Sequence, residues 1–272
     1  MTDLLMVTGA VVLSIALRSF GHWLPRKLGA AGILVATFLA CYLPTGSIAL
    51  GLVAMSIWFL LPWIELLTRV RRLRLPLQRS LEKQPPPGHA RFPSLTELTD
   101  EVEEAGFEYV ADTGWDWEEM TQFYRLFFNE EDKAEASICL TEQDGVGWVS
   151  LSLTSRAKDG RVFRTTNVPF SNPMQPTPEV LTHQVSTAER FDELHAEHKS
   201  WLENHNIEDQ LIAVDSPEDI TESIENEAGR QIRHNLEAGL VRLAETAETV
   251  RYSWRGLFYL YFQVVKDMVK LC

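Results

Sequence analysis

Long apolar runs occupy the first 67 positions of the chain, and mixed polar and apolar patterns follow. Ser47–Leu67 is uncharged except at Glu65 and runs into a basic cluster made of Arg69, Arg71, Arg72 and Arg74. About twenty apolar residues, at ~1.5 Å per residue, cross a hydrocarbon core of ~30 Å. Because positive charge near a span stays on the cytoplasmic side, these arginines predict that the span ends in the cytoplasm.

Two shorter apolar runs, Leu4–Leu17 and Gly29–Leu43, precede this one, and Pro44-Thr45-Gly46 is a turn signal between spans. With three spans, the basic segments Arg18–Lys27 and Arg69–Arg74 both lie on the cytoplasmic side, as the positive-inside bias requires. With two spans, one of the short runs lies in the interface or re-enters the membrane, or Gly29–Leu67 forms one bent helix. The charge distribution favours three spans over two.

The segment 69–92 is basic and then proline-rich, with Pro85-Pro86-Pro87-Gly88 near its end. Consecutive prolines favour the extended polyproline II conformation, which acts as a semi-rigid spacer. We therefore predict a juxtamembrane linker here, followed by a folded domain over 93–250.

Capping boxes mark three helix starts, because a Ser side chain can cap a helix while an acid three residues later reciprocates. They begin at Ser94, Ser186 and Ser216, and the last is reinforced by proline at the first helical position. The first helix is expected to end near Gly106.

Helical periodicity extends the second helix over Thr187–Asn204 and the third from Pro217 to about Thr249. Gly229 and Gly239 are positions at which the third helix could kink or divide. The last residues, 251–272, form a separate amphipathic pattern.

Between these helices, short β-type runs alternate with turn residues such as Asp144-Gly145 and Asp159-Gly160, a hairpin signal. Helix is the alternative for the first run, but strand is favoured, and Phe107–Ala111 is a candidate extra strand. The expected fold class is α+β, with an antiparallel meander. The predicted strands are Thr121–Phe128, Ala134–Thr141, Gly147–Ser155 and Arg161–Asn167.

The amphipathic segment 251–272 combines a wide apolar arc with aromatic and basic residues. That profile is typical of a helix in the membrane interface, and the alternative is a core helix that covers the sheet. The residues expected to contact the membrane interface or a partner are Trp254, Arg255, Phe258, Tyr261, Phe262, Lys266 and Lys270, together with Arg69, Arg71, Arg72 and Arg74.

The net charge of −13 is strongly segregated along the chain. Residues 1–92 carry ten basic and three acidic side chains, and residues 251–272 carry four basic and one acidic, which leaves 11 basic and 34 acidic residues in 93–250. A domain with this excess of acidic residues repels nucleic acid. We therefore exclude nucleic acid as a partner. The basic flanks are suited to an anionic lipid surface.

Few residues have the spacing of a catalytic or metal-binding site. His195 and His198 could share a metal at i, i+3 spacing, but they lie on an apolar helix face, where packed histidines are commoner. They remain weak metal candidates, and no cofactor is predicted. The acids around Trp115 could rim a pocket, but a solvated acidic turn is favoured. Four arginines among the strands could bind an acidic partner or offset the domain's own charge; they are Arg125, Arg156, Arg161 and Arg164.

These patterns predict four segments: a transmembrane anchor over 1–68, the linker over 69–92, an acidic α+β domain over 93–250 and an amphipathic helix over 251–272. We expect a multi-pass protein of a bacterial inner membrane, with its carboxy-terminal domain in the cytoplasm. The favoured function is a non-enzymatic accessory or interaction subunit that contacts membrane lipids and other membrane subunits. The alternative is a membrane-bound enzyme, possibly metal-dependent, with a site in the acidic domain.

Overall fold

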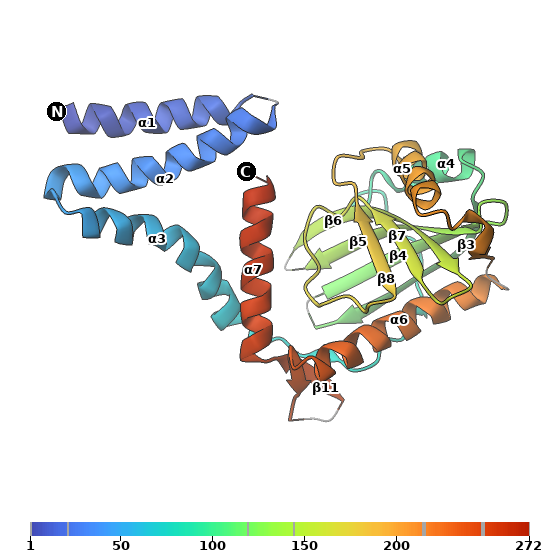
Figure 1. The fold of residues 1–272 in the computed structure, drawn as a ribbon. Coiled ribbons are helices and arrows are strands. Elements are labelled where there is room, and N and C mark those ends of the chain that lie inside the picture. The colour runs from blue at the N-terminus through green and yellow to red at the C-terminus, as the bar shows by residue number, and fades with distance from the viewer. Residues whose placement is uncertain are drawn as a thin grey trace. The chain divides into compact units, whose positions relative to one another are not determined.

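The computed structural model describes residues 2–20, 22–118, 120–143, 145–213, 216–245 and 248–271. The chain divides into two compact units. The helical unit comprises Met1–Leu73, Ser171–Pro173 and Arg251–Cys272, and the sheet unit comprises Arg74–Phe170 and Met174–Val250. The described residues form seven α-helices and a mostly antiparallel sheet, so the predicted α+β class is confirmed (Figure 1).

Helices α1 (Thr2–Arg18), α2 (Trp23–Thr45) and α3 (Ile48–Glu65) follow one another in the helical unit, and α3 continues into one π-helical turn, η1 (Leu66–Val70). Gly46 ends α2 in the left-handed region at φ 64°, and its N–H donates to the Tyr42 carbonyl. Ser47 then caps α3 by accepting the Leu50 N–H. The turn predicted at Pro44–Gly46 is therefore confirmed at Gly46, whereas Pro44 and Thr45 still belong to α2.

Two stretches of the helical unit are long and apolar enough to cross a membrane, Leu24–Thr45 and Ile48–Val70. Helix α1 is a third apolar helix, but it has only 17 residues. A third span thus stays a prediction.

Small residues bring these helices into close contact. A Cβ atom on Gly29 would lie 2.6 Å from the Ser14 carbonyl oxygen, and one on Gly51 would lie 2.6 Å from the Phe38 ring. Packing in lipid depends on such small residues, because the apolar surroundings give no hydrophobic force between helices. Helices α1 to α3 therefore use small side chains against one another.

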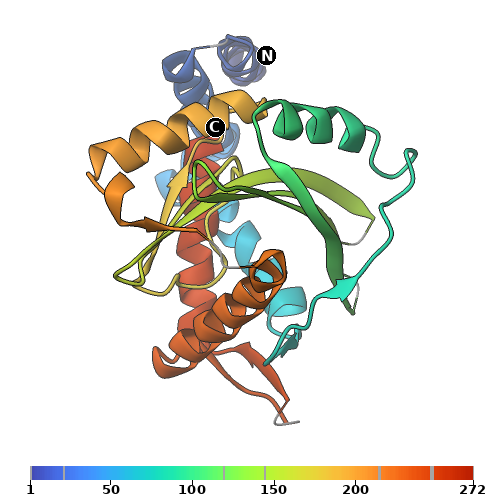
Figure 2. The same cartoon turned by 90° about the vertical axis from the view of Figure 1, so that its right-hand side faces the viewer.

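The large sheet of the sheet unit is a meander that runs from β2 to β8 in sequence order, with β9 beside β6. Every neighbouring pair is antiparallel except β7 and β8. Figure 2 shows the sheet curving between α4 and α5 on one side and α6 on the other. The strands are β2 (Glu82–Lys83), β3 (Glu108–Trp117), β4 (Met120–Asn129), β5 (Ala134–Gln143), β6 (Val146–Ala157), β7 (Val162–Thr166), β8 (Val180–Gln184) and β9 (Leu211–Ile212).

The four strands predicted for the meander are confirmed as β4 to β7, and the helical alternative for the first of them is wrong. Gln143 pairs with Val146, so β5 and β6 are joined by a two-residue loop. Gly145 takes φ 76° there, as this loop type requires, and Asp144 lies outside the described residues. The candidate strand at Phe107–Ala111 is much longer than predicted, because β3 pairs with β4 as far as Trp117.

The first predicted helix is α4 (Leu95–Glu104), which starts after Ser94 although the Ser94 side chain makes no capping hydrogen bond. The second, α5 (Phe191–Asn204), starts four residues later than predicted. The Phe191 N–H donates to Glu101 of α4 at 2.9 Å, so a carboxylate from another helix caps α5 in place of Ser186. The local sequence pattern around Ser186 cannot indicate Glu101, because Glu101 lies 90 residues before Phe191 in the chain.

The third predicted helix, α6 (Pro217–Glu237), ends well before Thr249. Gly239 adopts φ 69°, and the chain then forms β10 (Val241–Leu243) and β11 (Thr249–Tyr252). The predicted helix beyond Glu237 is therefore wrong. Strand β11 pairs with β1 (Leu75–Pro76) to complete a small three-stranded sheet.

The predicted linker contributes to the sheet unit. Besides β1, its Glu82 and Lys83 pair with β3, and Phe92 is 2% exposed. Phe92 joins the main core, in which one face of the sheet packs against α4 and α5 around Phe107, Phe127 and Phe191. A smaller cluster surrounds Phe163 at the end of α5.

Candidate functional site

Helix α7 (Trp254–Leu271) belongs to the helical unit, where it lies against the end of α3 (Figure 1). The Trp63 ring of α3 stacks on Tyr261 at 5.0 Å and meets Phe258 edge to face at 4.9 Å between ring centroids. The Arg71 guanidinium lies 5.0 Å from the centre of the Trp254 ring, a cation–π contact. Four of the predicted interface residues are thus brought together at this contact.

A second side of α7 holds Ser171–Pro173. Asp267 accepts the Ser171 N–H at 2.8 Å and the Ser171 hydroxyl at 2.6 Å. The Tyr259 hydroxyl donates to the Asn172 carbonyl at 3.5 Å. Because the bonds come from positions separated by two helical turns, they fix the rotation of α7 about its own axis.

An exposed apolar stripe, which we call the α7 stripe, runs along α7 and overlaps the side that meets Trp63 and Arg71. It consists of Trp254, Phe258, Phe262 and Val269, which are 54%, 51%, 66% and 57% exposed. At ~100° per residue these four positions fall on one side of the helix. Leu257 and Leu260, on another side, are buried. An exposed apolar surface of this kind marks an interaction site for protein or membrane.

The predicted basic residues separate into two groups. Arg255, Lys266 and Lys270 are exposed along α7. Arg69, Arg71 and Arg72 are exposed around the end of η1, and Arg69 forms the expected i, i+4 ion pair with Glu65 at 3.2 Å. Arg74 is half-buried in the sheet unit, where its carbonyl accepts the Trp117 indole N–H.

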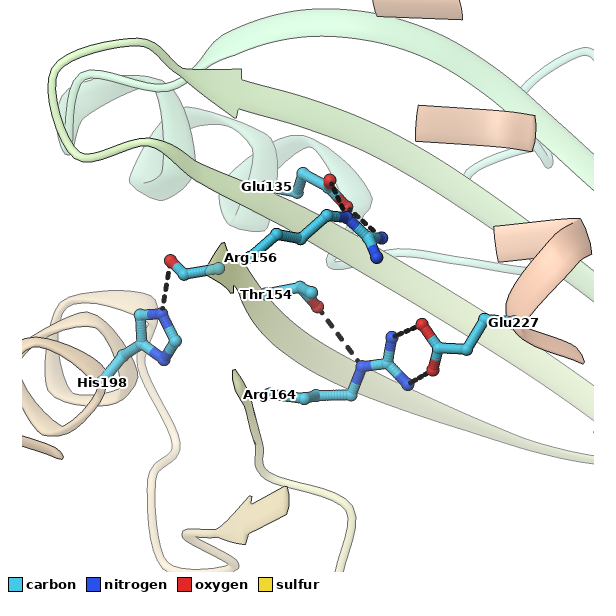
Figure 3. A network of polar contacts seen from close by, with 7 residues as sticks. Glu135, Thr154, Arg156, Arg164, His198 and Glu227 are labelled. Atoms are coloured by element: carbon cyan, nitrogen blue, oxygen red, sulfur yellow. Dashed lines mark hydrogen bonds and ion pairs between the residues drawn. The ribbon is translucent and has the colours of Figure 1, made fainter. Parts of the chain in front are cut away.

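In the sheet unit, the face of the sheet that looks toward α6 carries a polar network (Figure 3). Arg164 of β7 holds Glu227 of α6 through two bonds of 2.7 and 3.0 Å. Arg164 also donates to the Thr154 hydroxyl at 3.3 Å. On the neighbouring strands Arg156 holds Glu135 at 2.9 and 3.3 Å. Both acids are buried, so the arginines supply their charge compensation.

Arg125 is paired in the same way with Asp112 at 2.7 Å, and Arg161, just before β7, forms an exposed ion pair with Asp159 at 2.6 Å. The sequence left two interpretations of these arginines, and the structure supports the second, in which they offset the domain's own acids. Asp112 therefore belongs to an ion pair, and Trp115 is a buried strand residue, so the predicted acidic turn is wrong at these positions.

His198 of α5 is a core residue, 1% exposed. Its ring nitrogens lie 3.1 Å from the Ser155 hydroxyl and 2.8 Å from the Thr165 hydroxyl, both on strands beneath the helix. Burial lowers the pKa of His198 to about 4, because the charged imidazolium would lose its hydration. A neutral ring that both accepts and donates a hydrogen bond satisfies both hydroxyls.

His195 has different partners. Its Nε2 lies 2.8 Å from Asp132, and the Lys199 ammonium contacts the other Asp132 oxygen at 2.9 Å. Burial opposes the charge of Asp132, but the hydrogen bonds from Lys199 and His195 outweigh it and lower the pKa of Asp132. Burial also lowers the pKa of His195, although Asp132 acts in the opposite direction.

The two histidines are thus engaged separately, and the geometry does not bring them together on one metal ion. Within the described ranges, no group of three His, Cys, Asp or Glu residues has a metal-binding arrangement. Cavities of about 280 and 420 Å³ are both lined by Asp132 and Lys199, and His195 lines the smaller one. Asp132, His195 and Lys199 form a cluster, of which the sequence analysis identified only His195.

Cys139 lies on the polar face of the sheet and is buried. Its sulfur is 3.5 Å from the Thr141 hydroxyl, and burial raises the pKa of the thiol. Burial therefore disfavours the thiolate, which is the nucleophilic form of cysteine. Cys41 is also a free thiol, and Cys272 lies outside the described residues.

Sequence reasoning missed Asp132, Lys199 and Ser171 because their partners are 63 or more residues away in the chain. One available signal was Asp267, the single acid of the tail helix. In comparisons with known proteins, no family model matched the chain, and no curated protein or solved structure showed significant similarity to it.

Proposed function

We propose that this protein is a membrane-anchored accessory subunit of an inner-membrane assembly, without an enzymatic activity of its own. In this proposal the two apolar stretches Leu24–Thr45 and Ile48–Val70 cross the membrane, α1 is a third span, and the sheet unit is cytoplasmic. The observation that carries the proposal is the position of α7. It is held against Trp63 of the anchor while the α7 stripe stays exposed.

The charge distribution supports the same function. Residues 93–250 carry the excess of acidic side chains, which keeps such a domain away from an anionic lipid surface and leaves it available to a basic protein partner. Arg125, Arg156 and Arg164 are used within the sheet unit, where they pair with its own acids.

The test is the mass of the complex that the full-length protein forms. Native membranes are solubilised in mild detergent, and the protein is isolated through an affinity tag and analysed by native mass spectrometry. A defined hetero-complex supports the proposal and identifies the partner. A monomer or homo-oligomer in several mild detergents contradicts it.

A second candidate function, a membrane-bound enzyme, is favoured by the Asp132–His195–Lys199 cluster, which lines two cavities. A half-buried histidine paired with a carboxylate is an arrangement used in general acid–base catalysis. If a hydrolytic activity is found in the purified protein, His195→Gln should lower kcat at least tenfold, whereas His205→Gln, at the exposed C-cap of the same helix, should not. An unchanged kcat in His195→Gln would exclude this cluster as the site.

A further inference from the structure

The α7 stripe continues the apolar surface of α3. Trp63 belongs to the apolar stretch Ile48–Val70, and its ring contacts Phe258 of the stripe and the adjacent Tyr261. Trp254, one turn before Phe258, meets Arg71 at the basic end of the same stretch. The stripe therefore begins at the depth where α3 would leave a membrane. Tryptophan and tyrosine are enriched at that depth.

The charges of α7 are arranged around the stripe. Arg255, Lys266 and Lys270 are exposed, and at ~100° per residue they lie along one margin of the stripe. Asp267, the single acid of the helix, is nine positions from Phe258 and so lies on the opposite side, at ~180°. Ser171 holds its carboxylate there through two hydrogen bonds. The surface on and beside the stripe is consequently apolar and positive.

We propose that α7 is an anionic-lipid-binding helix, which lies in the membrane interface with the α7 stripe at the boundary between headgroups and acyl chains. Arg255, Lys266 and Lys270 contact phosphate-bearing headgroups of anionic phospholipids. Such helices bind through buried apolar area together with electrostatic attraction. The Asp267–Ser171 bonds orient the helix, because they keep the stripe and its basic margin toward the lipid.

The proposal commits to lipid as the occupant of the stripe for two reasons. The stripe is continuous through Trp63 with a stretch that is apolar enough to cross a membrane. Its basic margin also complements an anionic leaflet, which attracts cationic side chains within a Debye length. This site goes beyond the accessory-subunit function, because it needs no partner protein.

The experiment measures the depth of single residues of α7 in vesicles. The full-length protein, with Cys41, Cys139 and Cys272 changed to serine, receives one spin-labelled cysteine at position 258, 262 or 269, or at 263 as the control on another side of α7. It is reconstituted into vesicles of phosphatidylcholine, with or without about 30% phosphatidylglycerol, a fraction in the range at which anionic surfaces attract basic segments. Collision rates with oxygen and with a water-soluble nickel complex report the depth.

We expect labels at 258, 262 and 269 to collide preferentially with oxygen, and the label at 263 to collide preferentially with nickel. The contrast between the two groups should increase at least threefold with phosphatidylglycerol. In the triple variant Arg255→Gln, Lys266→Gln, Lys270→Gln, this contrast should not increase with phosphatidylglycerol. Asp267→Ala should reduce the difference between 262 and 263, because the helix is no longer fixed in rotation.

Two results would overturn the proposal. One is equal access of nickel to positions 262 and 263 in both lipid mixtures, which would place the stripe in water. The other is dipolar broadening between labels at 262, which would show a second copy of the chain on the stripe. Because the vesicles contain no other protein, failure here is distinct from failure of the accessory-subunit proposal.

Discussion

Arg164 and Glu227 form a two-point ion pair that joins strand β7 to helix α6, with N–O distances of 2.7 and 3.0 Å. Glu227 is 9% exposed and, at ~100° per residue, lies on the same side of α6 as the buried Ile220. A carboxylate on an apolar helix face is stable only with a partner, and Arg164 is that partner. The pair therefore fixes which side of α6 faces the sheet.

Replacing one member of this pair should be more harmful than replacing both. We expect Glu227→Ala to lower the free energy of unfolding by about 2–3 kcal/mol, since it leaves the Arg164 charge uncompensated, and Arg164→Met with Glu227→Leu to cost less. Urea denaturation of the full-length protein in detergent measures this. Glu222→Ala, at an exposed site of α6, is the control and should change stability by less than about 0.5 kcal/mol. Equal losses in the single and double variants would contradict the argument.

Acidification should destabilise the protein through His198. Its folded-state pKa of about 4 lies below the usual value of 6.5, so between these pH values the unfolded chain binds more protons than the folded one. Stability is then lost as pH falls from about 6.5 toward 4, by roughly 3 kcal/mol for this group at ~1.4 kcal/mol per pKa unit. Unfolding curves at pH 7, 6, 5 and 4 measure the slope.

A variant of His198 that cannot titrate tests whether this residue causes the pH dependence. His198→Gln keeps a hydrogen-bonding side chain but cannot titrate, so its stability should depend less steeply on pH than that of the unaltered protein. His205→Gln, on the exposed end of the same helix, should leave the slope unchanged. The same slope in all three proteins would show that His198 is not responsible.

Close packing of α1 on α2 should make Gly29 intolerant of any side chain. Its Cβ would meet the Ser14 carbonyl oxygen at 2.6 Å, a backbone atom that cannot move aside. We expect Gly29→Ala to destabilise the helical unit by about 1–3 kcal/mol, measured by denaturation in mixed micelles. Gly9→Ala is the matched control, because no heavy atom beyond its chain neighbours and its own helix backbone lies within 4 Å of a Cβ at position 9. The interpretation would fail if both variants behaved alike.

Trp63 should determine how firmly α7 is held. Trp63→Ala removes both aromatic contacts to Phe258 and Tyr261, each of the kind worth about 0.5–1.5 kcal/mol. Hydrogen exchange of the α7 amides should accelerate by roughly tenfold, as expected for a loss of about 1.4 kcal/mol. Trp58→Phe, which loses only a hydrogen bond to Thr37 of α2, should leave α7 exchange unchanged. Faster exchange in Trp58→Phe but not in Trp63→Ala would contradict this assignment.

The local signals of the sequence were sufficient for most elements. Strands β4 to β7 were predicted because alternation and Asp-Gly turns are properties of adjacent residues, and the start of α6 at Pro217 is equally local. The anchor helices followed from the length of the apolar runs. The α7 stripe could also be predicted in part, since Trp254, Phe258 and Phe262 repeat at helical spacing.

The errors arose where a distant segment decides between local alternatives. The helical periodicity of Leu236, Leu240 and Leu243 continues past Gly239, but β1 offers backbone partners to β11, and the chain turns into a hairpin. The start of α5 moved because Glu101 caps it from another helix.

The apolar helices, the acidic α+β domain and the aromatic, basic tail could be predicted, because those properties depend on neighbouring residues. Only the tertiary structure decided that the strand arginines neutralise the domain's own acids, that His195 and His198 serve different partners, and that Ser171 holds Asp267 away from the α7 stripe. Apart from Arg161–Asp159, each of these is a side-chain pairing across 13 or more residues. Such a pairing is selected by packing and charge compensation in three dimensions, which no periodicity along the chain records.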